Sequence, residues 1–201
     1  MKDYNKLSRQ AYNKAAREYS DSREGRFTYS FKRELVNMVA VDDGGAVLDV
    51  ACGTGDLLYM LSRKAKARFF GIDIADEMIA EANKRYPGID FCVGESAKLD
   101  FPDNYFDVIT VSAAFHHFPD PGRFLREAAR TLKMGGTLYI ADIFAPAVVR
   151  QIFNFVLLFS KSGDKKIYSA REMVRLCNDA GMKDVEIIII DNIQITRANK
   201  I

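Results

Sequence analysis

Two glycines separate two apolar segments in VLDVACGTGDLL, which covers residues 47–58. A carboxylate, Asp49, precedes them, and Gly53 and Gly55 stand in a G-x-G spacing. Glycine adopts positive φ angles easily and lets the backbone approach a ligand closely. A helix that begins after such a turn presents free N–H groups to a bound molecule. The stretch therefore indicates a ligand-binding turn or, alternatively, a tight turn that binds nothing.

A second carboxylate, Asp73, ends the next apolar segment, about 20 residues beyond the first glycine. In nucleotide-binding folds, an acid at this distance accepts hydrogen bonds from ribose hydroxyls. Alternatively, Asp73 could cap the helix expected to follow it. Asp76 can serve as that cap instead, so the spacing favours a ribose-binding role for Asp73.

The glycine turn lacks the patterns that bind phosphates. A dinucleotide-binding turn needs a third small residue, and Leu58 occupies that position. No G-x-x-x-x-G-K-[ST] run, which would cradle a phosphate chain, occurs in the sequence. The turn therefore suits a ligand that has a ribose and no phosphate, such as S-adenosylmethionine.

Strand-like and helix-like segments alternate along the chain, and this alternation must position the carboxylates and glycines. We expect strands at 46–51, 67–74, 89–94, 106–114 and 137–142, helices at 56–65, 75–86, 120–133 and 169–181, and a closing hairpin of 184–190 with 192–200. Ser169 and Glu172 match a capping box, and Gly135-Gly136 would end the third helix. Such alternation predicts an α/β fold with a mostly parallel sheet, helices on both faces and a C-terminal antiparallel hairpin.

Five ordered stretches resemble motifs of the class I S-adenosylmethionine-dependent methyltransferases. They are VLDVACGTGDLL (47–58), GIDIADEMIAEA (71–82), GESAKLDFPDNYFDVIT (94–110), SAAFHHFPDP (112–121) and LREAARTLKMGGTLYIAD (125–142). The sequence is most similar to the small-molecule subgroup that includes the ubiquinone and menaquinone C-methyltransferases. The resemblance implies a Rossmann-like seven-stranded sheet, S-adenosyl-L-methionine as cofactor and S-adenosyl-L-homocysteine as product.

The resemblance also implies cofactor contacts at ten positions, which are Asp49, Ala51, Gly53, Gly55, Asp73, Ile74, Met78, Glu95, Ser96 and Ser112. The first four and Ser112 would serve the methionine end, with Asp49 reaching the amino group directly or through water. Asp73 would hold both ribose hydroxyls, and the remaining four would surround the adenine. Met78 could equally be ordinary helix core. Two positions depart from the family pattern, because Ala51 stands where Gly is common and Glu95 where Asp is usual.

The only two histidines, His116 and His117, follow the fourth expected strand. An imidazole titrates near neutrality, so either could take a proton from the acceptor during methyl transfer. Alternatively, both shape the cofactor pocket or cap the next helix. We name both as candidate catalytic residues, and His117 resembles the more regular pocket-lining position.

We expect residues 1–201 to form one domain, with a helical cap (1–44), a cofactor-binding core (45–142), a substrate insert (143–167) and a last helix with the closing hairpin (168–201). The insert contains a strongly apolar run of Ile152, Phe153, Phe155, Val156, Leu157, Leu158 and Phe159. This run would be a lid over an apolar or aromatic acceptor, a buried packing helix or a dimer contact. In the cap, Tyr12 or Tyr19 would touch the cofactor.

Composition narrows the classes of partner. The chain has 29 basic and 27 acidic residues, a balance that argues against a nucleic-acid binder. Its three cysteines, Cys52, Cys92 and Cys177, have no C-x-x-C spacing, so we expect no disulfide framework and no metal site. No apolar run reaches the ~20 residues that a membrane span needs, and the N-terminus lacks a signal peptide. We therefore expect a cytoplasmic monomer or homodimer that acts on a small molecule.

Two other functions remain open. A protein that binds S-adenosylmethionine as a regulator or sensor would keep the same carboxylates and glycines. A nicotinamide-dependent oxidoreductase is disfavoured by Leu58 at the third small position. Motifs of DNA amino-group, cytosine-carbon and protein arginine methyltransferases are absent from the sequence, which leaves a small-molecule acceptor.

Overall fold

A computed structural model describes residues 3–157, 159 and 163–201. Within these residues, the strands are β1 (Ala46–Val50), β2 (Arg68–Asp73), β3 (Asp90–Val93), β4 (Phe106–Ser112), β5 (Leu132–Ile143), β6 (Lys183–Ile190) and β7 (Ile193–Asn199). The α-helices are α1 (Tyr4–Ala15), α2 (Arg23–Met38), α3 (Asp56–Ser62), α4 (Asp76–Arg85), α5 (Pro121–Thr131), α6 (Ala147–Leu157) and α7 (Ala170–Asp179). Two 3₁₀ helices, η1 (Ala16–Asp21) and η2 (Phe115–His117), complete the described elements.

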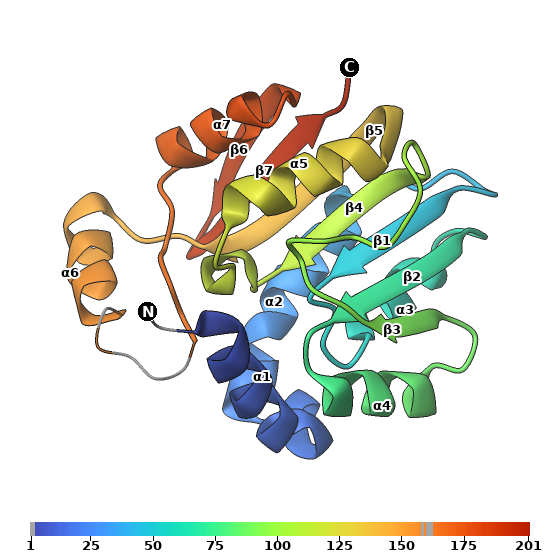
Figure 1. The fold of residues 1–201 in the computed structure, drawn as a ribbon, viewed down its shortest axis with the longest axis horizontal. Coiled ribbons are helices and arrows are strands. Elements are labelled where there is room, and N and C mark those ends of the chain that lie inside the picture. Colours follow the sequence, from blue (N-terminus) through green and yellow to red (C-terminus); the bar gives the residue numbers. More distant parts are fainter. Residues whose placement is uncertain (1–2, 158, 160–162) are drawn as a thin grey trace.

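The described strands form one seven-stranded sheet in the order β3-β2-β1-β4-β5-β7-β6 (Figure 1). The first five pair in parallel, whereas β7 lies antiparallel between β5 and β6. The predicted mostly parallel sheet and its closing hairpin are therefore confirmed. The chain runs outward from β1 to β3 and then returns to β4, so the strand order reverses between β1 and β4. A ligand crevice is expected outside the carboxyl ends of these two strands.

Alternate residues of β1 pack on opposite faces of the sheet, and the whole strand is buried. Leu48 joins an apolar cluster that includes residues of α5 and α7, and Val47 joins a second cluster that includes residues of α2 and α3. Figure 1 shows α5 in front of the sheet and α3 behind it. Because helices cover both faces of the sheet, the side chains of β1 that point to either face are mostly apolar.

The boundary between α5 and β5 differs from the prediction. The helix ends at Thr131 and the strand starts at Leu132, whereas the sequence pattern predicts a helix to 133 and a strand from 137. Leu132 pairs with Phe106 of β4, and the register then shifts before Val108. Gly135 has φ +79 within the strand, so this glycine accommodates an irregular strand rather than ending the helix.

The last helix begins as predicted. The Ser169 hydroxyl accepts a hydrogen bond from the backbone N–H of Glu172, and the Glu172 carboxylate accepts one from the backbone N–H of Ser169. Both bonds of the capping box are therefore present, and they satisfy two N–H groups that the helix itself leaves unpaired.

Helix α6 lies at one side of the molecule, away from the sheet (Figure 1). It buries none of its residues, and Val148, Ile152, Phe153, Phe155 and Val156 are each more than half exposed. A buried packing helix is therefore wrong for the described part of the insert, and Leu158 lies outside the described residues. None of the helices in the described ranges has the length and apolarity needed to cross a bilayer.

Candidate active site

The turn after β1 is held open by positive φ angles at Ala51 (+60), Gly53 (+52) and Gly55 (+81). The two glycines meet different surroundings. A Cβ built on Gly53 would touch nothing within 4 Å, whereas one on Gly55 would lie 2.5 Å from Cζ of Phe91. Gly53 therefore leaves open space beside the backbone, and Gly55 lets an aromatic ring pack against the start of α3.

Asp73 ties the glycine turn to the end of β2. Its Oδ2 accepts a hydrogen bond of 2.8 Å from the backbone N–H of Gly53, and its Oδ1 accepts one of 2.8 Å from Ala75. Burial raises the pKa of this carboxyl, and the two N–H groups oppose that effect. Asp73 thus fixes both the turn and the start of α4.

Asp76 does not cap α4, contrary to the sequence analysis. The N-cap is Ala75, which makes no side-chain capping bond. The Asp76 carboxylate instead accepts hydrogen bonds from Asn13 (2.8 Å) and Arg9 (3.1 Å) of α1. The first turn of α4 therefore holds the N-terminal helix in place, because two donors of α1 converge on one carboxylate oxygen.

A cavity with about 700 Å³ of empty space lies outside the ends of β1 and β4. It is lined by eight predicted site residues, which are Ala51, Gly53, Asp73, Ile74, Met78, Ser96, Ser112 and His117. The structure thus brings residues from positions 51 to 117 around one cavity, at the carboxyl ends of β1 and β4 where a ligand crevice is expected.

The N-terminal helices close this cavity from the other side. Asn5, Ser8 and Tyr12 of α1 line it together with Tyr19 of η1. Tyr12 and Tyr19 are the two residues expected to touch the cofactor, whereas Asn5 and Ser8 carry no recognisable sequence signal. The hydroxyls of Ser8 and Ser112 are buried and have no hydrogen-bond partner among the described residues. Buried hydroxyls without partners favour a polar ligand in this cavity.

A second cavity lies next to the first. Its lining includes Ala11 and Ala15 of α1, Phe27 and Thr28 of α2, and Ile143 at the end of β5. Glu24, His116 and Asp164 supply charged or titratable groups to the same lining. Tyr12, Ala113 and His117 line both cavities, so these three residues form a common wall.

Comparison with known proteins gives the family. Residues 48–140 match the family model described as a methyltransferase domain. This chain therefore contains a methyltransferase domain at residues 48–140. It is 37% identical over 131 residues to the demethylmenaquinone methyltransferase of Thermotoga maritima, a match that covers 63% of this chain and 57% of that relative. The chain thus spans less than two thirds of the length of this curated relative.

Solved structures share the fold of this methyltransferase domain. A chain of the complex between the Haloferax volcanii Trm112 methyltransferase activator and a methyltransferase superposes with TM-score 0.80 at 22% identity, covering 94% of this chain and 97% of that chain. Phosphoethanolamine N-methyltransferase 2 of Haemonchus contortus, solved with S-adenosyl-L-methionine, gives TM-score 0.78 at 15% identity. This match covers all of this chain and 60% of the other. At these identities the likeness establishes the fold.

Four predicted site residues of the methyltransferase domain do not line the first cavity. Asp49 is buried behind the turn and accepts a hydrogen bond of 2.7 Å from the Thr110 hydroxyl, and burial raises its pKa to about 7. Gly55 packs against Phe91, and Glu95 accepts a hydrogen bond from Asn5 of α1. His116 faces the second cavity instead.

The two histidines occupy opposite electrostatic surroundings. Burial alone would lower the pKa of His116, but the Asp142 carboxylate, 2.7 Å from its Nδ1, outweighs burial and the pKa rises to about 10. Burial lowers the pKa of His117 to about 4, with a further contribution from the charge on His116. At neutral pH the domain therefore holds a charged His116 beside a neutral His117.

The neutral His117 contacts the N-terminal helix. Its Nε2 lies 2.9 Å from the Tyr12 hydroxyl, which also donates to Glu24 at 2.9 Å. Burial and the neighbouring Glu24 carboxylate raise the pKa of Tyr12, so its hydroxyl stays protonated. The common wall of the two cavities thus contains a neutral imidazole and a neutral phenol in contact.

Proposed function

We propose that this domain transfers a methyl group from S-adenosyl-L-methionine to an apolar or aromatic small molecule. The observation that carries the proposal is the pair of cavities with a common wall of Tyr12, Ala113 and His117. Methyl transfer is an in-line displacement, so donor and acceptor must occupy adjoining sites with their reacting atoms in contact. Two adjoining cavities of this kind support a donor site and an acceptor site.

The first cavity fits the cofactor on three counts. Gly53 leaves open space beside its backbone, Asp73 offers a buried carboxylate, and the Ser8 and Ser112 hydroxyls lack partners within the described chain. Asp73 would hold the ribose hydroxyls, while Ile74 and Met78 would contact the adenine. When bound, S-adenosylmethionine supplies a methyl group activated by its sulfonium charge.

The second cavity suits an acceptor with an apolar ring and at least one oxygen. Ala11, Ala15, Phe27 and Ile143 give it an apolar lining, and Tyr12 and His117 offer hydrogen bonds. The similarity to a demethylmenaquinone methyltransferase supports the same class of acceptor. The neutral His117 would help to orient the acceptor, whereas its pKa of about 4 makes it a weak base for taking a proton from the acceptor.

Helix α6 would lie beside the route to the second cavity. Ile143, which precedes this helix, and Asp164, which follows it, both line that cavity. The exposed apolar side chains of α6 would then contact an apolar acceptor as a lid. A contact between two copies of the chain is the remaining alternative for this surface.

Turnover would separate the transferase from a regulatory protein that only binds S-adenosylmethionine. We would follow S-adenosylhomocysteine formation with demethylmenaquinone in its oxidised and reduced forms, using phosphoethanolamine as a polar comparison. Product formation only with the aromatic acceptor is the expected result. Cofactor binding without turnover on either acceptor would contradict the proposed acceptor class, and no turnover on a wider panel of aromatic acceptors would favour the regulatory function.

A further inference from the structure

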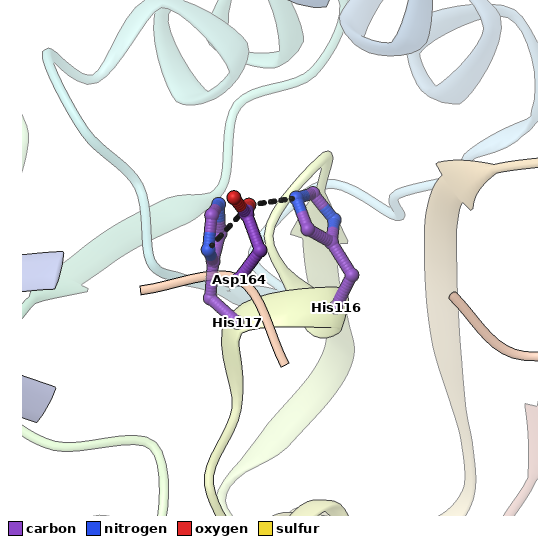
Figure 2. Close-up of side chains that lie close together, drawn as sticks. All are labelled: His116, His117 and Asp164. Carbon is purple, nitrogen blue, oxygen red and sulfur yellow. Dashed lines mark ion pairs between the residues drawn. The ribbon is translucent and has the colours of Figure 1, made fainter. Parts of the chain in front are cut away.

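Both histidines and one aspartate converge beside the second cavity. His116 and His117 come from η2, and Asp164 comes from the segment between α6 and α7 (Figure 2). Oδ1 of Asp164 lies 3.5 Å from Nε2 of His116 and 3.2 Å from Nδ1 of His117. One ligand atom from each residue fits within a group no more than 4.8 Å across. This arrangement brings two imidazoles and a carboxylate around one point.

The backbone fixes Asp164 at this point. The N–H groups of Lys165 and Lys166 donate to the carbonyl of His116 at 2.8 and 3.1 Å. On the other side, Gly163 has φ +92, and a Cβ there would lie 2.3 Å from Oγ of Ser8 in α1. The segment that carries Asp164 is therefore attached to η2 and pressed closely against the N-terminal helix.

Each imidazole is oriented by a partner on its other nitrogen. Nδ1 of His116 lies 2.7 Å from Oδ1 of Asp142, whose Oδ2 accepts a second bond of 2.7 Å from the His116 backbone N–H. Nε2 of His117 lies 2.9 Å from the Tyr12 hydroxyl. Histidines that bind metals are commonly held in this way by a carboxylate or another polar group on the second nitrogen.

The available protons leave Nδ1 of His117 without a hydrogen bond to any of the described residues. The Tyr12 hydroxyl has one proton, and when it donates to Glu24, His117 must donate from Nε2 to Tyr12. The lone pair on Nδ1 of His117 then faces the Asp164 carboxylate, and this buried nitrogen makes no hydrogen bond among the described residues. Two acceptors that face each other at 3.2 Å are stabilised by a cation between them.

The local charge has the sign and size that suit a divalent cation. Asp142 and Asp164 would carry two uncompensated negative charges once a metal ion has displaced the proton that charges His116 in the metal-free protein. A divalent cation would neutralise both. Metal–ligand bonds of about 2.1 Å place tetrahedral ligands about 3.4 Å apart, close to the 3.2 and 3.5 Å separations in the structure.

We propose that Nε2 of His116, Nδ1 of His117 and the Asp164 carboxylate bind a divalent transition-metal ion. Two imidazoles and one carboxylate suit Zn²⁺, Fe²⁺ or Co²⁺, whereas Mg²⁺ and Ca²⁺ prefer sites made of oxygen ligands. All three residues line the second cavity, so the remaining coordination positions would face it. If the acceptor occupies this cavity, a point that rests on the function proposed above, its oxygen would be the next ligand of the ion.

Metal binding is tested on the protein alone, without cofactor or acceptor. Zn²⁺ would be titrated by calorimetry into chelator-treated protein without an affinity tag, and Co²⁺ binding would be followed by its visible absorption. We expect one equivalent to bind and Asp164→Asn to weaken Zn²⁺ binding at least tenfold. Asp90→Asn is the matched control, because it makes the same change at an exposed position of β3 outside the three-residue cluster, and it should change the affinity less than threefold.

The chain has two histidines, so imidazole NMR of the wild-type protein gives a second readout that does not depend on variants. Zn²⁺ should shift the nitrogen signals of Nε2 in His116 and Nδ1 in His117, and should change the other two nitrogens less. Absence of binding would overturn the proposal. Binding that Asp164→Asn leaves intact, with unchanged imidazole signals, would also overturn it and would indicate another ligand such as the exposed Cys92. Either failure would leave the methyltransferase proposal unaffected, because no cofactor is present.

Discussion

The Tyr12 hydroxyl lies 2.9 Å from Nε2 of His117, and this contact joins the N-terminal helix to the segment after β4. The two rings meet edge to face, with centroids 5.6 Å apart. Both residues line both cavities, so their contact separates the proposed donor site from the proposed acceptor site. The N-terminal helix is therefore part of the site as well as a cover for it.

Replacing Tyr12 with phenylalanine removes this hydrogen bond and keeps the ring. We expect kcat/KM for the acceptor to fall by about tenfold or more, because His117 loses the partner that orients it. Steady-state kinetics with the aromatic acceptor measures the effect. Tyr59→Phe is the control, since Tyr59 is partly exposed on α3 and stacks on Tyr86. Equal kcat/KM for Tyr12→Phe and wild type would argue against a role for the contact.

Alanine substitutions at the two glycines of the turn should separate binding from stability. Gly55→Ala places a Cβ against Phe91 at φ +81, so we expect a loss of about 2–4 kcal/mol in the free energy of unfolding. The Cβ added by Gly53→Ala would contact no protein atom. We therefore expect the free energy of unfolding to fall by about 1–2 kcal/mol, from backbone strain alone. The added methyl group would enter the cofactor space and weaken cofactor binding at least tenfold. Denaturant unfolding and calorimetry measure the two effects, and the opposite ranking would contradict this division of roles.

Much of the fold follows from sequence patterns, because each element carries a local signal. The five parallel strands, the hairpin and the capping box of Ser169 with Glu172 are all predicted correctly. The start of β5 is missed because Leu132 reads as the end of an amphipathic helix until its pairing with Phe106 is known. That pairing joins distant parts of the chain, and no local pattern encodes it.

The site is predictable where a motif fixes the residue and its backbone together. Gly53 and Asp73 follow each other at a recognisable distance, and the structure joins them by a hydrogen bond. Gly55 belongs to the same motif, yet its neighbour Phe91 comes from β3 and decides that its role is packing. Asp164 lies in a segment with no motif, so its convergence on the histidines emerges only from the tertiary structure.

Asp49 should make stability depend on pH. Burial raises its folded-state pKa to about 7, above the value of an exposed aspartate, so the folded state binds the proton more tightly. The stabilisation is fully present below about pH 4 and is lost as the pH rises through about 7, by up to about 4 kcal/mol. We expect Asp49→Asn to lack this component, so its stability relative to wild type should rise from pH 4 to 7 and then level off. Denaturant unfolding of wild type and Asp49→Asn across this pH range measures the difference in their free energies of unfolding, with Asp90→Asn as an exposed control. A difference that does not change with pH would contradict the expectation.

Polar substitutions on α6 should test its proposed role as a lid. Phe153 and Phe155 are 51% and 64% exposed, so replacing both with serine should change the free energy of unfolding by less than about 1 kcal/mol. We expect KM for an apolar acceptor to rise at least fivefold, with an unchanged Kd for the cofactor. Met134→Ser, an exposed apolar site at the start of β5, is the control. An unchanged KM together with a shift from dimer to monomer in sedimentation would assign α6 to a contact between copies.

Cofactor binding through Asp73 is the central claim, and titration calorimetry tests it most directly. S-adenosylmethionine and S-adenosylhomocysteine would be titrated into wild type, Asp73→Asn and the exposed control Asp90→Asn. We predict micromolar binding to wild type and to the control, and at least a tenfold weaker affinity for Asp73→Asn, which corresponds to about 1.4 kcal/mol. Folded wild-type protein that binds neither ligand, or binding that Asp73→Asn leaves unchanged, would contradict the claim.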